Sequence, residues 1–371
     1  MQATAMGAGT GTAAVSAARD FADSIERFDT YGCTLYRELA RRALADAELI
    51  ALADRTRPGQ FPAFMLFTAV QYLLMGDPGH RLARWFASLN DPPAPAADAY
   101  DPFRSYCLAN RAPIEALIGT CTLQSTMPGR ISYLLPAVAH VCAAAAAPLS
   151  LVEIGCSAGV TTLFDHMACD YGDGQRLGAA DAPLTVRAQL GAGSMPLPVA
   201  PVRIARRWGI ELEPVEITDP SACRWLLAQL PPEPRVDQEE LAAALQVRRA
   251  HPFPILAGDA LELLPGLAAA IEGPLLVLHS QALYQWPEQV REALDRILAD
   301  LGAARTVHRL GVERNPIAPA RVRAHVQGRF PPDQSVIVHS VYDSGPPRHA
   351  YLGEVDGRGK WLRWTVEPLS P

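Results

Sequence analysis

The sequence lacks the markers of several common protein classes. Only 19% of its residues are charged and its formal net charge is −6, which argues against a broad basic surface for nucleic acid. The apolar stretch at 143–151 is far too short to span a bilayer. The first residues are rich in Gly, Ala and Thr and lack the basic and apolar segments of a signal peptide. We therefore expect a cytoplasmic protein with neither a nucleic-acid nor a membrane partner.

Metal and disulfide frameworks are also missing from the pattern of cysteines and acids. The seven cysteines are scattered, odd in number, and form no Cys-x-x-Cys pair, which predicts reduced thiols and no zinc site. The turn at 170–174 carries two carboxylates, but it is too short for the calcium loop of an EF-hand. We expect a plain turn there and no metal.

Two kinds of hydrophobic pattern divide the 371 residues. After a tail at 1–15, which we expect to be disordered, residues 16–146 show apolar residues at helical spacing and no strand signal. This region predicts a helical cap domain, and its apolar helices could carry a homodimer interface. The segments expected to be helical include 64–75, 80–89, 103–118 and 131–145.

From residue 147 to 371 the pattern changes to strands alternating with helices, which indicates an α/β fold. The strands are apolar and suit a parallel sheet covered on both faces. Turn residues at 356–359 predict a hairpin near the C-terminus. The five expected parallel strands are 149–154, 202–212, 254–257, 275–278 and 306–312, and further strands are expected at 335–342, 350–355 and 360–366.

The first of these strands runs into a glycine turn with the spacing Glu-x-Gly-x-x-x-Gly. Glu153 supplies a carboxylate near the turn, and Gly155 and Gly159 remove side chains where a ligand could approach the backbone. Ser157 lies between the two glycines. This spacing differs from the Gly-x-Gly-x-x-Gly of dinucleotide-binding proteins.

Acids also follow the second and third expected strands. Glu211 offers two acceptor oxygens that suit a pair of ribose hydroxyls, with Glu213 as the alternative. Asp259, followed by Ala260, could accept a hydrogen bond from an adenine amino group, or it could cap the next helix, and the two roles are compatible.

The fourth expected strand ends in a cluster of polar residues. His279 and Ser280 lie where open α/β sheets bind ligands, and Tyr284 follows shortly after. His279 or Tyr284 could act as a general base. A purely structural histidine is the competing interpretation.

A polar segment precedes the first strand and carries Gln124, Ser125, Thr126 and Arg130. One interpretation is an ordinary helix connection with a helix cap at Ser125 or Thr126. The other is a segment that faces a substrate, with Arg130 available for a carboxylate.

In their order along the chain, these motifs resemble those of class I S-adenosylmethionine-dependent methyltransferases over about 149–366. The chain also resembles a bacterial family of unknown function that combines such a core with a helical N-terminal half. In that family a Gln-Thr-Asn-Glu-x-x-Arg-like segment precedes the first strand, whereas this chain has Met127 in place of the acid. The matching stretches are 124–130, 151–159, 170–172, 209–215, 258–260, 279–280 and 359–364.

The resemblance implies a Rossmann-like class I methyltransferase sheet with an antiparallel C-terminal hairpin, and S-adenosylmethionine as the cofactor. Residues 147–371 would then be the cofactor-binding domain and the helical domain a lid. Glu211 would meet the ribose, Asp259 and Ala260 the adenine, and His279 and Ser280 the reacting centre. The turn residues Glu153, Gly155, Ser157 and Gly159 would contact the cofactor, and Gln124, Ser125, Thr126, Arg130 and Tyr171 would contact the substrate.

Three functions are compatible with this resemblance. The first is in-line methyl transfer to a small molecule, because the sequence shows neither an aromatic-plus-basic platform nor an Asn/Asp-Pro-Pro-aromatic motif after the fourth strand. The second is other chemistry on S-adenosylmethionine, such as intramolecular displacement with release of methylthioadenosine. The third is a non-catalytic binding module with the same fold.

Overall fold

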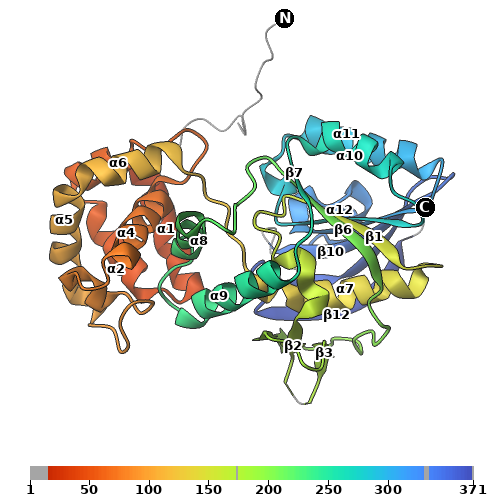
Figure 1. The fold of residues 1–371 in the computed structure, drawn as a ribbon, viewed down its shortest axis with the longest axis horizontal. Coiled ribbons are helices and arrows are strands. Elements are labelled where there is room, and N and C mark those ends of the chain that lie inside the picture. Colours follow the sequence, from red (N-terminus) through yellow and green to blue (C-terminus); the bar gives the residue numbers. More distant parts are fainter. Residues whose placement is uncertain (1–15, 173, 330–333, 370–371) are drawn as a thin grey trace, which may run out of the picture. The chain divides into compact units, whose positions relative to one another are not determined.

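The computed structural model describes residues 16–172, 174–329 and 334–369. The tail expected at 1–15 lies outside the described residues. The chain divides into two compact units, one of Met1–Ser125 with Glu216–Ala242 and one of Thr126–Val215 with Ala243–Pro371 (Figure 1). Each unit is described by itself.

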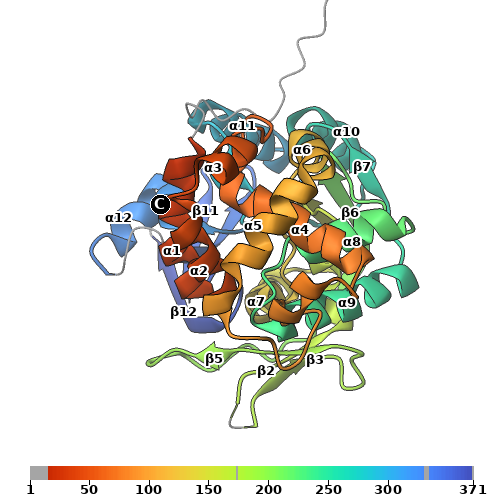
Figure 2. The same ribbon diagram turned by 90° about the vertical axis from the view of Figure 1, so that its left-hand side faces the viewer.

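The first unit is helical, as the hydrophobic spacing predicts. Figure 2 shows the helices α1, α2, α4 and α5 gathered together. Their core is aromatic and includes Phe21, Phe28 and Phe67. Ser16 caps the start of α1, and Gly32 ends it in the left-handed conformation. The helices are α1 (Ala17–Tyr31), α2 (Thr34–Ala43), α3 (Ala47–Ala53), α4 (Pro62–Gly76), α5 (Tyr100–Ala109), α6 (Arg111–Thr120) and α8 (Pro220–Ala228), with 3₁₀ turns η1 (Arg81–Trp85) and η2 (Ala96–Asp98).

Two helices of this unit differ from the expectation. The segment 80–89 forms only the 3₁₀ turn η1, which His80 caps through Nδ1. The expected helix 103–118 is two helices, because the chain leaves the helical conformation at Asn110. Hydrophobic spacing continues across that break, so the pattern alone does not reveal it.

The boundaries of the units also differ from the expected division at 146/147. Residues 216–242 join the helical unit because α8 packs on α4, where the buried Gln71 donates hydrogen bonds to the carbonyls of Ala228 and Leu230 at 2.9 and 2.6 Å. In turn α7 (Ile131–Ala144) belongs to the second unit, since it packs on β9, β10 and β12. The boundary between residues 242 and 243 falls inside α9 (Arg235–Ala250).

The second unit is an α/β fold around a nine-stranded, mostly parallel sheet of order β5-β12-β11-β10-β9-β8-β1-β6-β7. Five neighbouring strands are parallel, and β10, β11 and β12 extend the sheet in antiparallel fashion. The strands are β1 (Leu149–Ile154), β5 (Gln189–Leu190), β6 (Ile204–Glu211), β7 (Ile255–Ala257), β8 (Leu275–Ser280), β9 (Val307–Arg314), β10 (Ser335–Tyr342), β11 (Arg348–Val355) and β12 (Trp361–Leu369).

Helices cover both faces of this sheet. On one face α10 (Ala260–Ala269), α11 (Glu288–Gly302) and α12 (Ala320–Val326) pack on alternate strand residues such as Val152, Val277 and Val336. On the other face lies α7, whose His140 ring contacts that of His339 on β10. Because successive strand residues point to opposite faces, the register decides which polar side chains share a face.

The sequence pattern also predicts an insertion at 175–201 with one strand at 184–190, and the structure of this region is more elaborate. A separate three-stranded sheet of order β3-β2-β4 forms from β2 (Ala168–Asp170), β3 (Arg176–Gly178) and β4 (Thr185–Arg187). Before it, the sequence pattern predicts a helix at about 160–167, and the chain forms the 3₁₀ segment η4 (Thr161–His166), with a kink at Leu163.

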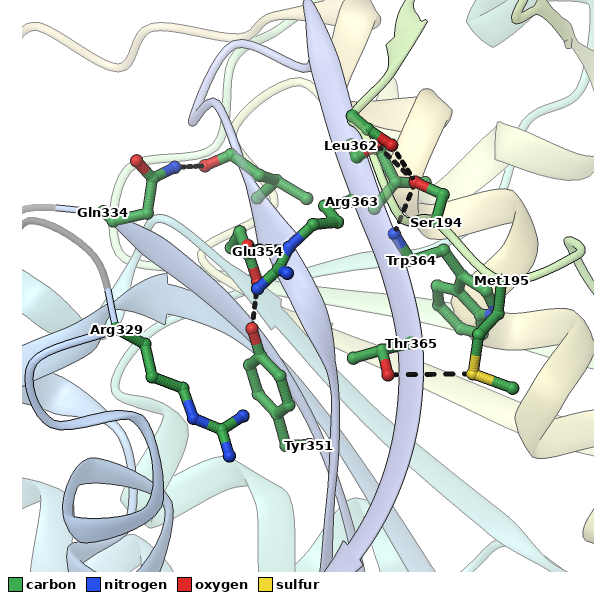
Figure 3. Close-up of polar contacts among 12 residues, drawn as sticks. Ser194, Met195, Arg329, Gln334, Tyr351, Glu354, Leu362, Arg363, Trp364 and Thr365 are labelled. Atoms are coloured by element: carbon green, nitrogen blue, oxygen red, sulfur yellow. Dashed lines mark hydrogen bonds and ion pairs between the residues drawn. The ribbon is translucent and has the colours of Figure 1, made fainter.

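Side-chain contacts hold the last two strands to each other and to this insertion (Figure 3). The Glu354 carboxylate on β11 accepts from the Tyr351 hydroxyl and from Arg363 on β12. Ser194 Oγ accepts from the Trp364 N–H at 3.3 Å and donates to the Leu362 carbonyl at 3.5 Å. The C-terminal strands are therefore an integral part of the sheet.

Candidate functional site

The five parallel strands run in the order β7-β6-β1-β8-β9, so the chain moves outward from β1 in one direction and then from β8 in the other. Such a reversal point is where open α/β sheets bind ligands, at the carboxyl ends of the strands. The residues that follow β1 and β8 are therefore the first place to look for a site.

Three backbone N–H groups of the glycine turn after β1 donate hydrogen bonds to other groups of the protein. The N–H of Gly155 donates to Ile210 O at 2.9 Å, and that of Gly159 donates to Cys156 O at 2.8 Å. Ser157, itself in the left-handed conformation at φ 53°, donates its N–H to Glu211 Oε2 at 2.8 Å. Phosphate-binding loops point such N–H groups at the ligand, so this turn is unsuited to a phosphate.

Both glycines of the turn are needed for packing and for backbone conformation. Their φ values are +69° and +72°. A side chain on Gly155 would lie 2.7 Å from Ala282 Cβ, and one on Gly159 would lie 2.6 Å from Phe253. Gly155 is nevertheless exposed, which leaves its backbone open to a ligand.

Glu153 is buried directly below the turn, where it is only 2% exposed. Its carboxylate accepts hydrogen bonds from the hydroxyls of Thr161, at 2.7 Å, and Thr162. Burial raises the pKa of Glu153 to about 7, against the lowering effect of the two threonines and of Arg130. In this arrangement the carboxylate fixes η4 to the end of β1.

Glu211 stands at the end of β6 and is half-buried, whereas Glu213 is exposed. The Glu211 carboxylate accepts backbone hydrogen bonds from Ser157, at 2.8 Å, from Leu212, at 2.9 Å, and from Glu213. Burial raises the pKa of Glu211, and these N–H groups oppose that rise. Since each carboxylate oxygen has two lone pairs, Glu211 can still accept a hydrogen bond from a further donor beside the glycine turn.

Asp259, after β7, is the N-cap of α10, as one of the two interpretations of the sequence held. Its Oδ1 accepts from the Leu261 N–H at 2.8 Å, and the residue is exposed while Ala260 is buried.

His279, at the end of β8, is buried and fully engaged. Its Nδ1 lies 2.9 Å from Glu313 Oε1, and its Nε2 accepts from Arg309 Nε at 2.9 Å. Because Nε2 accepts, the ring proton is on Nδ1 and the ring is neutral. Burial, followed by the Arg309 charge, lowers the His279 pKa. This geometry argues against the general-base role, because neither ring nitrogen is free to take a proton.

Ser280 faces the opposite side of the sheet from His279, so the two do not meet at one point. Its Oγ lies 2.9 Å from the buried Tyr133 hydroxyl, and its carbonyl accepts from Arg130 at 3.5 Å. Arg130 also donates to the Gly357 carbonyl at 3.2 Å. Arg130 therefore connects β8 to the C-terminal hairpin.

The remaining predicted substrate residues are dispersed. Gln124 and Ser125 belong to the first unit, and Thr126 is buried in the second. The N-cap position of η3 (Pro128–Arg130) is Met127, which makes no side-chain cap hydrogen bond, so the N-cap is at neither Ser125 nor Thr126.

The two tyrosines among the predicted site residues differ in exposure. Tyr171 is buried, and its hydroxyl donates to the Ser132 carbonyl. Tyr284 is half-buried, with the Arg314 guanidinium 5.4 Å from its ring centre.

Glu313 lies at the end of β9. It is an acid that follows the fifth parallel strand, but the sequence motifs do not single it out. Its Oε1 accepts from His279 and from the N–H groups of Ala282 and Leu283 at 3.0 and 2.9 Å. It therefore holds the segment that packs on Gly155.

Among the helices of the described residues, none has the length and apolar character that a membrane span requires.

Comparisons with known proteins identify the family of the chain but do not establish an activity. No curated protein matches the chain. One solved structure, "Structure of the CcbJ Methyltransferase from Streptomyces caelestis", aligns at 11% identity and a TM-score of 0.20, covering 67% of this chain and 76% of that one. Residues 16–364 match the family described as "Uncharacterized protein conserved in bacteria (DUF2332)". That match spans nearly all of the sequence and agrees with the resemblance to a bacterial family of unknown function, so the chain belongs to this family.

Proposed function

We propose that the second unit binds S-adenosylmethionine at the ends of β1, β6 and β7 and that the protein transfers its methyl group to a small molecule. One observation carries this proposal. A glycine turn with inward-bonded N–H groups lies at the reversal point of the strand order, beside the carboxylate of Glu211. This combination suits a ligand with a ribose and no phosphate.

The carboxylates at this edge of the sheet suit the charge of S-adenosylmethionine, whose sulfonium and ammonium groups are cationic. Glu211 would accept hydrogen bonds from the ribose hydroxyls, and the second oxygen of Asp259 is available for the adenine amino group. The exposed backbone of Gly155 would lie against the methionine portion. Glu153 is a positioning residue in this scheme, because threonine hydroxyls occupy both of its oxygens.

Bound S-adenosylmethionine would supply a methyl group already activated by the positively charged sulfur. The protein then needs to orient an acceptor in line with that group and exclude water. His279 contributes by holding Glu313 and through it the segment at Ala282 and Leu283. Tyr284, in the next turn, is the remaining predicted general base.

The direct test is calorimetry with S-adenosylhomocysteine on the full chain. We expect binding to the wild type, and a loss of about tenfold or more in Glu211→Gln, because a hydrogen bond to a charged group contributes about 1.5–3 kcal/mol. Glu213→Gln, two residues away and exposed, is the matched control and should bind as the wild type does.

Absence of binding to the folded wild type would contradict the proposal, as would equal losses in both variants. Incubation with S-adenosylmethionine alone adds a chemical readout. Release of methylthioadenosine without any acceptor would replace methyl transfer by intramolecular displacement while leaving the cofactor site intact.

A further inference from the structure

The proposed cofactor has a third charged group besides its two cations, the α-carboxylate of its methionine portion. The acids at the ends of β1, β6 and β7, which are Glu153, Glu211 and Asp259, would not attract this carboxylate. Its partner should be a cationic side chain near Gly155 that has no counter-ion of its own. Arg130, the last residue of η3 and the N-cap position of α7, meets both conditions.

Arg130 has hydrogen-bond donors to spare. Its Nε donates to the Gly357 carbonyl at 3.2 Å and its Nη1 to the Ser280 carbonyl at 3.5 Å. An arginine side chain has five N–H donors, so both donors of Nη2 remain. Nη2 forms no hydrogen bond among the described residues. It is also not among the fully buried side-chain atoms that lack a partner, so it is accessible to a ligand.

The positive charge of Arg130 is not neutralised by an acid. Among the described residues, no carboxylate forms an ion pair with it. Burial raises the pKa of Glu153, and the charge of Arg130 opposes that rise. The Glu153 oxygens, however, are bound by the hydroxyls of Thr161 and Thr162. A half-buried guanidinium with free donors and no counter-ion favours a carboxylate ligand.

Arg130 lies beside the glycine turn at the end of β1. In the parallel ladder of β1 and β8, Ile154 is paired with His279. Gly155 and Ser280 are the next residues of the two strands, and neighbouring strands are about 4.8 Å apart. Because the Ser280 carbonyl accepts from Arg130, the guanidinium is within reach of a ligand group that lies on the backbone of Gly155.

We propose that Arg130 binds the α-carboxylate of S-adenosylmethionine and thereby selects the intact cofactor over a decarboxylated one; this inference rests on the proposed function. The sequence motifs imply a contact of Arg130 with the substrate, whereas its position beside Gly155 favours the methionine portion of the cofactor. Holding the amino-acid end of the ligand also orients the sulfur and its methyl group. Arg130 is thus a binding and specificity residue and takes no part in proton transfer.

The test is calorimetry on the full chain with two ligands that differ only in the carboxylate. These are S-adenosylhomocysteine and its decarboxylated analogue. The wild type should bind S-adenosylhomocysteine about tenfold or more tightly than the analogue, because only the former offers a charged acceptor to Arg130.

Two variants change the charge and the geometry of the guanidinium. In Arg130→Gln the affinity for S-adenosylhomocysteine should fall about tenfold or more, and the affinity for the analogue should stay as in the wild type. Retained binding of the analogue also shows that the variant is folded. Arg130→Lys keeps the charge and should recover part of the loss. Arg206→Gln, at an exposed position of β6 opposite Ser150, is the control and should bind both ligands as the wild type does.

The outcomes separate this inference from the proposed function. Unchanged affinity for S-adenosylhomocysteine in Arg130→Gln would overturn the inference and leave the carboxylate of an acceptor as the group that Arg130 meets. Equal losses for both ligands would overturn it too, because Arg130 would then only hold β8 to the hairpin. A wild type that binds both ligands equally would overturn it while the cofactor site stands. A folded wild type that binds neither ligand would refute the proposed function, and this inference with it.

Discussion

Replacement of Glu153 by glutamine should make the protein more stable at alkaline pH relative to the wild type. The wild-type carboxylate is buried below the glycine turn, and its pKa is about 7 instead of the ordinary 4.5. Glutamine keeps an oxygen acceptor for a threonine hydroxyl but carries no charge. The variant therefore removes the cost of ionising a buried group and retains much of the local hydrogen bonding.

The sign and size of the effect follow from proton linkage. Above pH 4.5 the unfolded chain releases this proton, whereas the folded chain holds it until about pH 7. The folded state binds more protons in that window, so wild-type stability falls as pH rises through it. With about 1.4 kcal/mol for each pKa unit, the total is on the order of 3 kcal/mol.

The assay is urea denaturation of wild type and Glu153→Gln at pH 4.5, 6 and 8.5, followed by circular dichroism. The difference in unfolding free energy between the two should shift in favour of the variant by on the order of 3 kcal/mol from the lowest to the highest pH. Glu292→Gln, which changes an exposed carboxylate, should show no comparable shift. A difference that is flat with pH would refute the reasoning, because it would mean that Thr161 and Thr162 keep Glu153 ionised in acid.

Three further perturbations test the same region. Thr162→Val removes a donor to Glu153 and should cost about 1–3 kcal/mol at pH 8.5 and less at pH 5, where the carboxyl is protonated; an equal cost at both values would contradict this. Gly155→Ala should destabilise the fold by more than Gly172→Ala, because both positions have positive φ but only Gly155 would also meet Ala282; thermal melting compares them. Burial, with the neighbouring His308 and His140, lowers the pKa of His339 to about 3, so wild-type stability should be lost as pH falls from 6.5 towards 3. His339→Gln should reduce this loss of unfolding free energy at acid pH, as measured by denaturation curves. An unchanged loss would show that the ring is already protonated in the folded state.

Much of the second unit follows from local patterns that the sequence displays directly. The apolar run 275–278 and the glycine turn after Ile154 predict a strand and its carboxyl end because both signals are short-range. The five expected parallel strands all form, with boundaries shifted by a few residues. The hairpin turn at 356–359 also forms, with the Gly359 N–H bonded to the Asp356 carbonyl at 2.8 Å.

What the pattern does not contain is the partner of each polar side chain. The sequence left His279 open between a general base and a structural histidine, and only the pairing of β8 with β9 shows that Arg309 and Glu313 occupy both ring nitrogens. His279 and Ser280 point to opposite faces because β8 continues through Ser280, beyond the expected end at residue 278. The unit boundary is equally non-local, since Gln71 meets Ala228 across 157 residues of chain.

The short strand β5 has a consequence for self-association. An open sheet ends in two strands whose unpaired N–H and C=O groups invite a strand from another copy. At one edge, β7 has only three residues. At the other, N–H groups of residues 189–195, in and after β5, donate to the carbonyl of Lys360, just before β12, and to those of Leu362 and Trp364 on β12. The insertion between β4 and β6 thus covers this edge of the sheet and prevents a strand of another copy from pairing with it. Shortening the insertion would expose a strand that contains Trp361 and Trp364.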